Sequence, residues 1–369
     1  MNDEWGFCGC VPADDGRDAG YGMTFAMSNR LVNSVSAFSR GVCGRHGDGG
    51  ELRFLDERQT DGSGTGEAVV DPLASQGALA PDESGCFLFA VNAGSNSVTS
   101  FRLEDGCLTL AGVAPSGGVR PVSIAAHGNG VYVLNAGADG VDATLNGFNV
   151  NGSGVLLPIV DSQAIVSPAA AQPACVVFSP DGCRLIVSVR NQNLLLSFRV
   201  LPGGQLEEPV TTSSSGEGPF GIIFARCDIL LVSEAGPNAL SSYHLEENGA
   251  LSAVSASVAN GQLATCWVAV TPDGRYAYTA NAGSGTISVY HVSKRGVLTL
   301  IESVPTTPAM NGAPIDLMVA PDGRFLYVLN GRQGSISAFR IECEGHPALV
   351  QVYQHTRSSE VGAQWIAVL

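Results

Sequence analysis

Two charged residues, Arg190 and Glu234, interrupt a repeated phrase that elsewhere holds asparagine at the same place. The phrase begins with an apolar residue, which is followed by the asparagine or its substitute and usually by Ala-Gly. A polar loop comes next, and the phrase ends at an aromatic residue that a serine often precedes. A carboxylate in a cleft can act as a general acid or base, and a guanidinium can bind an anion or steady an oxyanion. We therefore take Glu234 and Arg190 as candidate catalytic residues, with a structural ion pair between neighbouring repeats as the alternative.

The regular members of this row are asparagines. Asparagine before Ala-Gly favours the left-handed backbone conformation and bonds to nearby backbone groups, which indicates capping of strands. Contact with a bound ligand is the alternative role. The asparagines of the row are Asn29, Asn92, Asn135, Asn281 and Asn330.

The repeat also predicts the fold. The phrase occurs seven times, at intervals between 43 and 63 residues, and most copies follow a turn of the type Pro-Asp-Gly and an inner apolar segment. A period of roughly 40–50 residues with several short strands per unit is typical of a β-propeller blade. The sequence therefore predicts an all-β, seven-bladed β-propeller with four-stranded blades.

The two ends of the chain indicate how the ring closes. Residues 21–38 begin at the second strand of a blade, whereas Ala363–Val368 reads as an innermost strand with nothing after it. A C-terminal strand that completes the N-terminal blade would leave no free sheet edge. We expect a flexible tail over residues 1–20, one propeller domain over 21–369, and a loop insertion at about 41–66, which is rich in Gly, Asp and Arg.

The inner strands of a propeller surround a channel, and its mouth is the expected place for a ligand. Phe220, Trp267 and Trp365 would give that mouth aromatic walls; packing between blades is the alternative. Asp316 is a carboxylate in an apolar strand, so burial would raise its pKa, unless the position is solvated. The other inner-row candidates for substrate contact are Gln76, Ser123, Cys175 and Gln364.

Composition excludes several classes of partner. Lys and Arg number 19 against 34 Asp and Glu, which gives a formal net charge of −15, and no run of basic residues occurs. A nucleic-acid binder carries a basic surface, so nucleic acid and anionic membranes are excluded as expected partners. No apolar run approaches the length of a membrane helix. We expect a monomer that binds a small molecule.

Other common catalytic motifs are absent from the sequence. It has no nucleophile elbow, phosphate-binding loop, dinucleotide fingerprint or zinc-protease motif, and its six histidines lack ligand spacing, so we expect no cofactor and no metal. Ten cysteines without a CxxC pair, and no signal-peptide pattern, favour the cytoplasm. Secretion is the alternative if a leader has been removed.

Three turn phrases carry a resemblance to a known family. They begin at Phe178 (FSPDG), Val270 (VTPDGRYAYTAN) and Ala320 (APDGRFLYVLN). These phrases resemble the lactonase-type seven-bladed propellers, a family that includes bacterial 6-phosphogluconolactonases and fungal carboxy-cis,cis-muconate cyclases. The resemblance covers residues 21–369 and implies a seven-bladed propeller with chemistry on lactones.

The family's catalytic groups are only partly present. Its histidine-bearing inner strand corresponds here to Ala174 and Cys175, and its Pro-Arg-His entry corresponds to residues 219–221, Pro-Phe-Gly. Its glutamate, in a Val-Asn-Glu phrase, matches Glu234 in Val-Ser-Glu. Without the arginine and histidine, the resemblance implies a divergent member with a changed substrate.

We therefore expect a lactonase-like enzyme that acts on a small, relatively apolar cyclic or lactone-type substrate. The reaction would be a hydrolysis, a cyclisation or an isomerisation, with Glu234 as acid/base. A non-catalytic propeller that binds a small molecule or a protein partner is the alternative from another class, because a fold does not fix a function. An extracellular scaffold is a third possibility.

Overall fold

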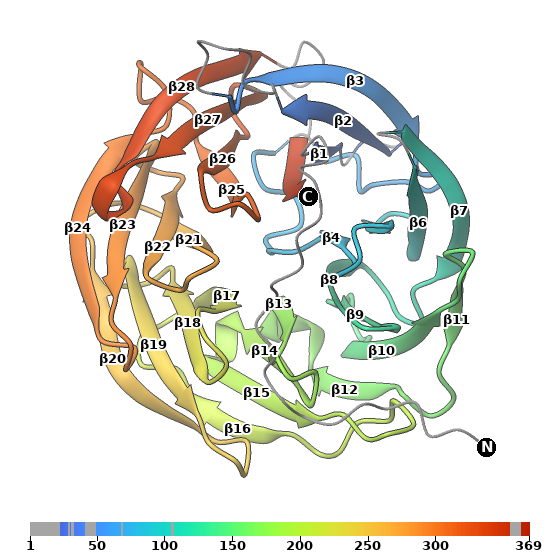
Figure 1. The fold of residues 1–369 in the computed structure, drawn as a ribbon. Coiled ribbons are helices and arrows are strands. Elements are labelled where there is room, and N and C mark those ends of the chain that lie inside the picture. The colour runs from blue at the N-terminus through green and yellow to red at the C-terminus, as the bar shows by residue number, and fades with distance from the viewer. Residues whose placement is uncertain are drawn as a thin grey trace.

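Seven separate antiparallel sheets surround a common axis in the computed structural model (Figure 1). The structure describes residues 23–28, 30, 33–40, 49–67, 69–104, 107–354 and 363–369. The predicted all-β, seven-bladed propeller is confirmed. Within these ranges, no helix has the length and apolar character needed to cross a membrane.

The first blade combines the two ends of the chain, as the sequence predicts. Strand β1 pairs antiparallel with β29 on one side and with β2 on the other. Ring closure therefore rests on the hydrogen bonds of a C-terminal strand inside an N-terminal sheet. From the axis outward the strands are β29 (Ala363–Val368), β1 (Met23–Ser28), β2 (Ser34–Arg40) and β3 (Leu52–Gln59).

Strand β3 corrects the expected loop insertion at 41–66. Residues 52–59 pair along the whole of β2 and form the outer strand of the first blade. The glycine- and arginine-rich composition concealed this strand, because an outer strand faces solvent and does not need the apolar alternation of an inner one. Residues 41–48 and the expected tail over 1–20 lie outside the described residues.

The second to fourth blades follow in chain order. The second contains β4 (Leu79–Pro81), β5 (Phe87–Asn92), β6 (Ser97–Glu104) and β7 (Cys107–Pro115). The third contains β8 (Pro121–His127), β9 (Gly130–Asn135), β10 (Ala143–Val150), β11 (Leu156–Pro158) and β12 (Ala164–Ser167), which also pairs with β10. The fourth contains η1 (Ala169–Ala171) at its entry, then β13 (Pro173–Phe178), β14 (Arg184–Val189), η2 (Arg190–Gln192), β15 (Leu194–Arg199) and β16 (Val210–Ser213).

The last three blades are the most regular. The fifth contains β17 (Pro219–Phe224), β18 (Ile229–Glu234), β19 (Ala239–Leu245) and β20 (Leu251–Ala259). The sixth contains β21 (Thr265–Val270), β22 (Tyr276–Asn281), β23 (Thr286–Val292) and β24 (Leu298–Pro305). The seventh contains β25 (Pro314–Val319), β26 (Phe325–Asn330), β27 (Ser335–Ile341), η3 (Cys343–Gly345) and β28 (Pro347–Gln354).

The turn between the inner and second strands follows from its residue types. In the sixth blade, Thr271 N–H donates to Tyr276 O at 2.9 Å, and Asp273 Oδ1 accepts from Arg275 N–H at 3.0 Å. Gly274 has a φ of 64°, which a residue without a Cβ adopts at little cost. Such turns reverse the chain on the face opposite the ends of the second strands.

Buried tyrosines join neighbouring blades. Tyr278 donates its hydroxyl to Gly345 O at 2.8 Å, and Tyr327 donates to Gly50 O at 3.0 Å. Each acceptor lies ahead of the outer strand of the next blade. The rings fill the apolar space between sheets while their hydroxyls keep a partner, which is the arrangement that makes a buried tyrosine favourable.

Candidate functional site

The row of asparagines at the ends of the second strands lies inside the blades. Asn281 Nδ2 donates to Thr286 Oγ1 at 3.1 Å and to Ser288 Oγ at 2.9 Å, so it bonds hydroxyls five and seven residues ahead. The same spacing links Asn330 to Ser335 and Ser337. Asn92 and Asn135 are also fully buried and bonded to hydroxyls of their own blades. These contacts favour the capping role of the row.

Glu234 occupies the same kind of place in the fifth blade. It is fully buried, and its Oε1 accepts from Gly216 N–H at 2.8 Å and from Ser241 Oγ at 2.7 Å. Ser214 also donates to Oε1, and Ser257 donates to Oε2. The carboxylate is therefore held by donors of its own blade and the loop before it.

Arg190 lies one residue beyond the row in which the sequence alignment placed it. Strand pairing sets Pro121 opposite Asn135 and Pro314 opposite Asn330, and it sets Pro173 opposite Val189. Val189, which is fully buried, is thus the counterpart of the asparagines. Strand β14 ends at Val189, and Arg190 is the first residue of the 3₁₀ segment η2. The extra residue turns the arginine away from the blade interior.

A second repeated feature stands immediately before the inner strands. One residue there has a left-handed backbone, and its carbonyl accepts the N–H of the residue that follows the asparagine row, as Arg120 O does from Ala136 at 2.8 Å. Gln172 O accepts in the same way from Arg190 at 3.3 Å. The left-handed residues are Arg120, Gln172, Gly218, Ala264 and Ala313, with φ between 48° and 68°.

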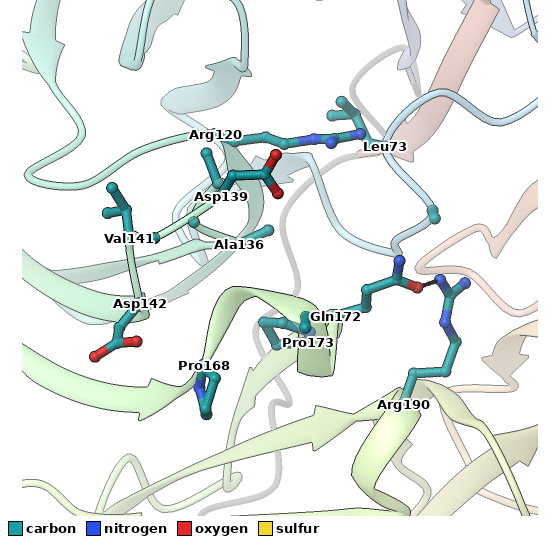
Figure 2. Close-up of a pocket in the computed structure, with 15 residues that line it drawn as sticks. Leu73, Arg120, Ala136, Asp139, Val141, Asp142, Pro168, Gln172, Pro173 and Arg190 are labelled. Carbon is teal, nitrogen blue, oxygen red and sulfur yellow. Dashed lines mark hydrogen bonds between the residues drawn. The ribbon is translucent and has the colours of Figure 1, made fainter.

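A cavity of about 450 Å³ opens on this face, between the third and fourth blades. Its polar wall contains Arg120, Arg190 and Gln172, and Figure 2 shows the Gln172 amide oxygen facing the Arg190 guanidinium to which it is hydrogen-bonded. Asp139 and Asp142 lie on the loop after β9. The apolar lining includes Leu73, Ala74, Ala136, Val141, Pro168 and Pro173.

Asp71 adds a titratable carboxylate two residues before Leu73 of the lining, although it does not line the cavity itself. Its Oδ1 accepts from Ala74 N–H at 3.0 Å, which fixes the side chain within a tight turn. Loss of hydration raises the pKa of Asp71 to about 7, although that hydrogen bond and the charges of Arg190 and Arg120 act to lower it. A carboxyl group with a pKa near neutrality can both take up and release a proton under ordinary conditions.

Arg120 and Arg190 are positioned by contacts that leave much of each guanidinium available. Arg120 Nη2 donates to Pro72 O at 2.8 Å, while its buried Nε has no hydrogen-bond partner. The Arg190 guanidinium carbon lies 5.8 Å from the centre of the Phe220 ring, within the range of a cation–π contact. Two arginines therefore line one cavity, and the carboxyl group of Asp71 interacts electrostatically with both.

The aromatic candidates pack in the wall of the channel. Phe220 and Trp267 are buried, with ring centres 5.1 Å apart in an edge-to-face arrangement. Trp267 Nε1 donates to Ser75 O at 2.9 Å. These contacts match the packing alternative, and neither residue lines the cavity beside Arg190.

The polar candidates of the inner row have protein partners. Gln76 Nε2 donates to Val268 O at 2.8 Å, and Ser123 Oγ donates to Gln76 O at 2.6 Å. Cys175 is buried, and burial raises the pKa of its thiol to about 12. Gln76 precedes β4 instead of standing in it, because that strand begins only at Leu79.

Asp316 is buried, which agrees with the first of its two alternatives, a buried carboxylate, and not with a solvated position. Its Oδ1 accepts from Leu317 N–H and its Oδ2 from Ile366 N–H, both at 2.9 Å. Loss of hydration raises the pKa of Asp316 to about 7, those two donors lower it, and the charge of Asp71 raises it further. The carboxyl group thereby joins β25 to the closing strand β29.

Three candidates cannot be placed. Asn29 lies outside the described residues, and the side chains of Gln364 and Trp365 are likewise outside the description, although β29 includes both positions. Within the described ranges, no three His, Cys, Asp or Glu side chains gather as a metal site.

Sequence reasoning missed Asp71, Arg120 and Gln172. A signal for Arg120 was present, because it is the charged member of a row that otherwise contains Gln172, Gly218, Ala264 and Ala313. Asp71 begins a phrase that has no counterpart in the other repeats, and such a departure from the repeat is itself a signal. Asp71 is far from Arg120 and Arg190 in the sequence, so the repeat did not predict that the three residues lie near one another in the fold.

Comparison with known proteins agrees with this architecture. Residues 245–358 match the family described as "Lactonase, 7-bladed beta-propeller". The chain is 27% identical over 289 residues to a 6-phosphogluconolactonase of Serratia proteamaculans, which covers 73% of this chain and 79% of that protein. A 6-phosphogluconolactonase of an Enterobacter species is 26% identical over 285 residues.

Solved structures share the fold at lower sequence identity. A putative 6-phosphogluconolactonase from Bacteroides fragilis superposes with a TM-score of 0.71 and 16% identity, covering 96% of this chain and all of that one. A periplasmic gluconolactonase from Pseudomonas aeruginosa superposes with a TM-score of 0.70 and 17% identity, covering 94% and 99%. At such identities the likeness extends to the fold alone.

Proposed function

We propose that this chain, which belongs to the lactonase family of seven-bladed β-propellers, hydrolyses a small lactone in the cavity between its third and fourth blades. The observation that supports this most is that Arg120 and Arg190 line one cavity while the carboxyl group of Asp71, two residues before the lining residue Leu73, interacts electrostatically with both. Lactone hydrolysis needs a base for the attacking water and a cation for the developing oxyanion. The arginines of the cavity lining are candidates for the cation, and Asp71, next to the lining segment, is the candidate base.

The proposed reaction uses Asp71 as the base. Its ionised carboxylate takes a proton from a water molecule as the water oxygen bonds to the lactone carbonyl carbon. The resulting oxyanion lies against the Arg190 guanidinium, where a charge-assisted hydrogen bond stabilises it. The ring carbon–oxygen bond then breaks, and protonated Asp71 returns the proton to the departing alkoxide, which gives a hydroxy acid.

The cavity also constrains the substrate. Its volume of about 450 Å³ suits a single small ring with short substituents. Leu73, Pro168 and Pro173 offer an apolar surface to one face of such a ring, while Gln172 and Asp139 can accept or donate hydrogen bonds at its edge. The sequence predicts a relatively apolar substrate. We keep that prediction for one face of the ring and expect polar oxygens on the other face.

Glu234 is the competing candidate for the acid/base role. Its contacts with Gly216, Ser214, Ser241 and Ser257 account for both carboxylate oxygens. Neither Glu234 nor Asp71 lines the cavity itself, but Asp71 interacts electrostatically with Arg120 and Arg190 of the lining. We therefore prefer Asp71 as the base and give Glu234 a structural role.

The test is a panel of lactones that differ in ring size and charge, including neutral sugar lactones, a phosphorylated sugar lactone and an aromatic lactone. Ring opening is followed by proton release and confirmed by mass spectrometry. We expect turnover of at least one neutral or singly charged lactone by the native chain, and its loss in Asp71→Asn. The matched control is Asp228→Asn, a carboxylate in the groove on the opposite face.

Two outcomes would contradict the proposal. Equal turnover by Asp71→Asn and Asp228→Asn would remove Asp71 from the mechanism. An absence of turnover across the panel, together with a small molecule that co-purifies with the chain and protects it thermally, would support the non-catalytic binding propeller instead.

A further inference from the structure

Residues 71–77, here called the crossing segment, run through the middle of the ring before β4 begins (Figure 1). Gln76 N–H donates to Ala174 O of β13 at 2.9 Å, and Gly77 O accepts from Ile124 N–H of β8 at 2.7 Å. Ser75 O accepts from Trp267 Nε1 of β21. The segment therefore contacts the inner strands of several blades besides its own.

The Gln76 side chain spans the channel to the sixth blade. Its Nε2 donates to Val268 O at 2.8 Å, and its Oε1 accepts from Val268 N–H at 3.1 Å. One side-chain amide thus satisfies both backbone groups of a residue 192 positions away, as a neighbouring strand would. Loss of that amide would leave two backbone groups without these partners.

The fifth blade makes room for this contact. A Cβ on Gly221 would overlap Gln76 Oε1 and would lie 2.8 Å from Cys266 O. Glycine at this point of β17 lets the amide pass between two inner strands. The other end of the crossing segment is fixed by Arg120, which donates to Pro72 O at 2.8 Å.

We infer that the crossing segment closes the central channel beneath the cavity, and that Gln76 is a positioning residue that holds Asp71 beside Arg120 and Arg190. The positioning half of this inference rests on the proposed hydrolase function, whereas the closure of the channel does not. Leu73 and Ala74 of the same segment line the cavity, so the segment forms part of its floor. A substrate then enters and leaves by one face of the propeller.

Cys266 provides a reporter of this closure that needs no enzymatic activity. Cys266 is only partly exposed, and loss of hydration raises the pKa of its thiol to about 12, with the charge of Asp71 adding to the rise and that of Arg190 opposing it. The thiolate is the nucleophile that attacks an alkylating reagent, so a partly covered thiol with a raised pKa reacts slowly. Release of the crossing segment would admit water and reagent to Cys266.

The experiment compares Gln76→Ala and Gln76→Met with the native chain by iodoacetamide labelling, and mass spectrometry quantifies the Cys266 peptide against the peptide of exposed Cys227. We expect Cys266 to react about tenfold faster in both variants, because loss of the amide pairing favours local opening. Gln76→Met keeps the length of the side chain, and it provides the test if Gln76→Ala does not fold. Gln205→Ala is the matched control, since Gln205 Nε2 also donates to a backbone carbonyl, Val160 O, but at the surface.

A kinetic measurement tests the positioning role separately. In Gln76→Met we expect a fall in kcat with little change in KM, because Arg190 keeps its contacts with Gln172 and Phe220, and a shifted midpoint in the pH profile. Equal Cys266 labelling in all four proteins would overturn the closure. Faster labelling with an unchanged kcat and pH profile would overturn the positioning role. If the native chain hydrolyses no lactone, the proposed function and the positioning role fail together, and the labelling still decides the closure.

Discussion

Ser241 Oγ lies 2.7 Å from Glu234 Oε1, and seven residues separate the two across the hairpin of β18 and β19. The same separation joins Asn281 to Ser288 at 2.9 Å in the next blade. Glu234 therefore takes part in a blade-internal contact that asparagine makes elsewhere. Glu234 thus has a carboxylate where the other blades have a neutral amide, and its side chain stays inside the blade.

Glu234→Gln should therefore lower stability more than activity. The amide would present donors to Gly216 N–H and to hydroxyls that now donate to the carboxylate, and unsatisfied buried polar groups cost roughly 1–3 kcal/mol. We expect a lower melting temperature, with kcat on the accepted lactone within about twofold of the native value, given that only a group acting on the reacting atoms contributes to proton transfer. Thermal unfolding and steady-state kinetics measure the two effects.

Glu208→Gln, at an exposed site, is the control for this substitution and should change neither quantity. A hundredfold fall in kcat with an unchanged melting temperature would restore Glu234 as the acid/base group, since removal of such a group costs about that much.

The pH dependence of the reaction should report Asp71. The group works as a base only when it is ionised, and it is ionised above its pKa of about 7. We expect kcat/KM to rise with pH and to level off above that midpoint. In Asp71→Asn the profile should be flat and lower by roughly 10²–10⁴-fold. A midpoint near the ordinary aspartate value in the native chain would argue against Asp71 as a base with a raised pKa.

Arg190→Ala should impair catalysis strongly, because Arg190 is assigned to the oxyanion. Loss of one such donor typically costs about 10²–10³-fold in rate, and the reduction should appear in kcat/KM. Arg190→Lys should recover part of it, since the charge returns without the planar fork. Arg199→Ala, in the groove on the opposite face, is the control. Equal rates in Arg190→Ala and Arg199→Ala would contradict the assignment.

The sequence was sufficient to predict the seven-bladed ring because short-range interactions define each repeat. Turn residues such as Pro272 to Gly274 and the alternating apolar residues of Tyr276–Asn281 act over a few positions, and seven copies reinforce one another. The closing strand β29 was predictable for the same reason, since its residues resemble those of β21.

The site was less predictable because it depends on contacts between distant repeats. A shift of one residue moved Arg190 out of the asparagine row, and only strand pairing with Val189 opposite Pro173 reveals it. Gln76 lies in an irregular segment and contacts a residue 192 positions away. The repeat does not predict how that segment aligns with the inner strands. Burial of Glu234 also depends on Ser257, two strands further along the blade.

Asp316 should make stability depend on pH in a defined direction. Its pKa is about 7 in the folded chain against 3.8 for an unperturbed aspartate. Between these values the folded chain holds a proton that the unfolded chain has lost, so the free energy of unfolding falls as pH rises and levels off above about 7. Asp316→Asn should flatten this slope, as measured by urea unfolding across that range.

Asp71 contributes with the same sign, because its pKa is raised to a similar value. The slope remaining in Asp316→Asn should therefore diminish again in the double variant with Asp71→Asn. A constant offset is expected as well, since asparagine has one oxygen where Asp316 accepts from both Leu317 and Ile366. Parallel curves for the native chain and Asp316→Asn would show that Asp316 is ionised throughout.

The left-handed residues before the inner strands should tolerate glycine better than alanine. Ala264 and Ala313 have φ values of 57° and 48°, a region in which a Cβ approaches the backbone unfavourably. The fifth blade already has Gly218 at this place. We expect Ala313→Gly to raise the free energy of unfolding by about 0.5–1 kcal/mol, measured by urea unfolding, because relief of strain exceeds the added freedom of the unfolded chain. Ala348→Gly, in strand β28, should instead lower it by a similar amount, and a loss of stability in both variants would contradict the strain argument.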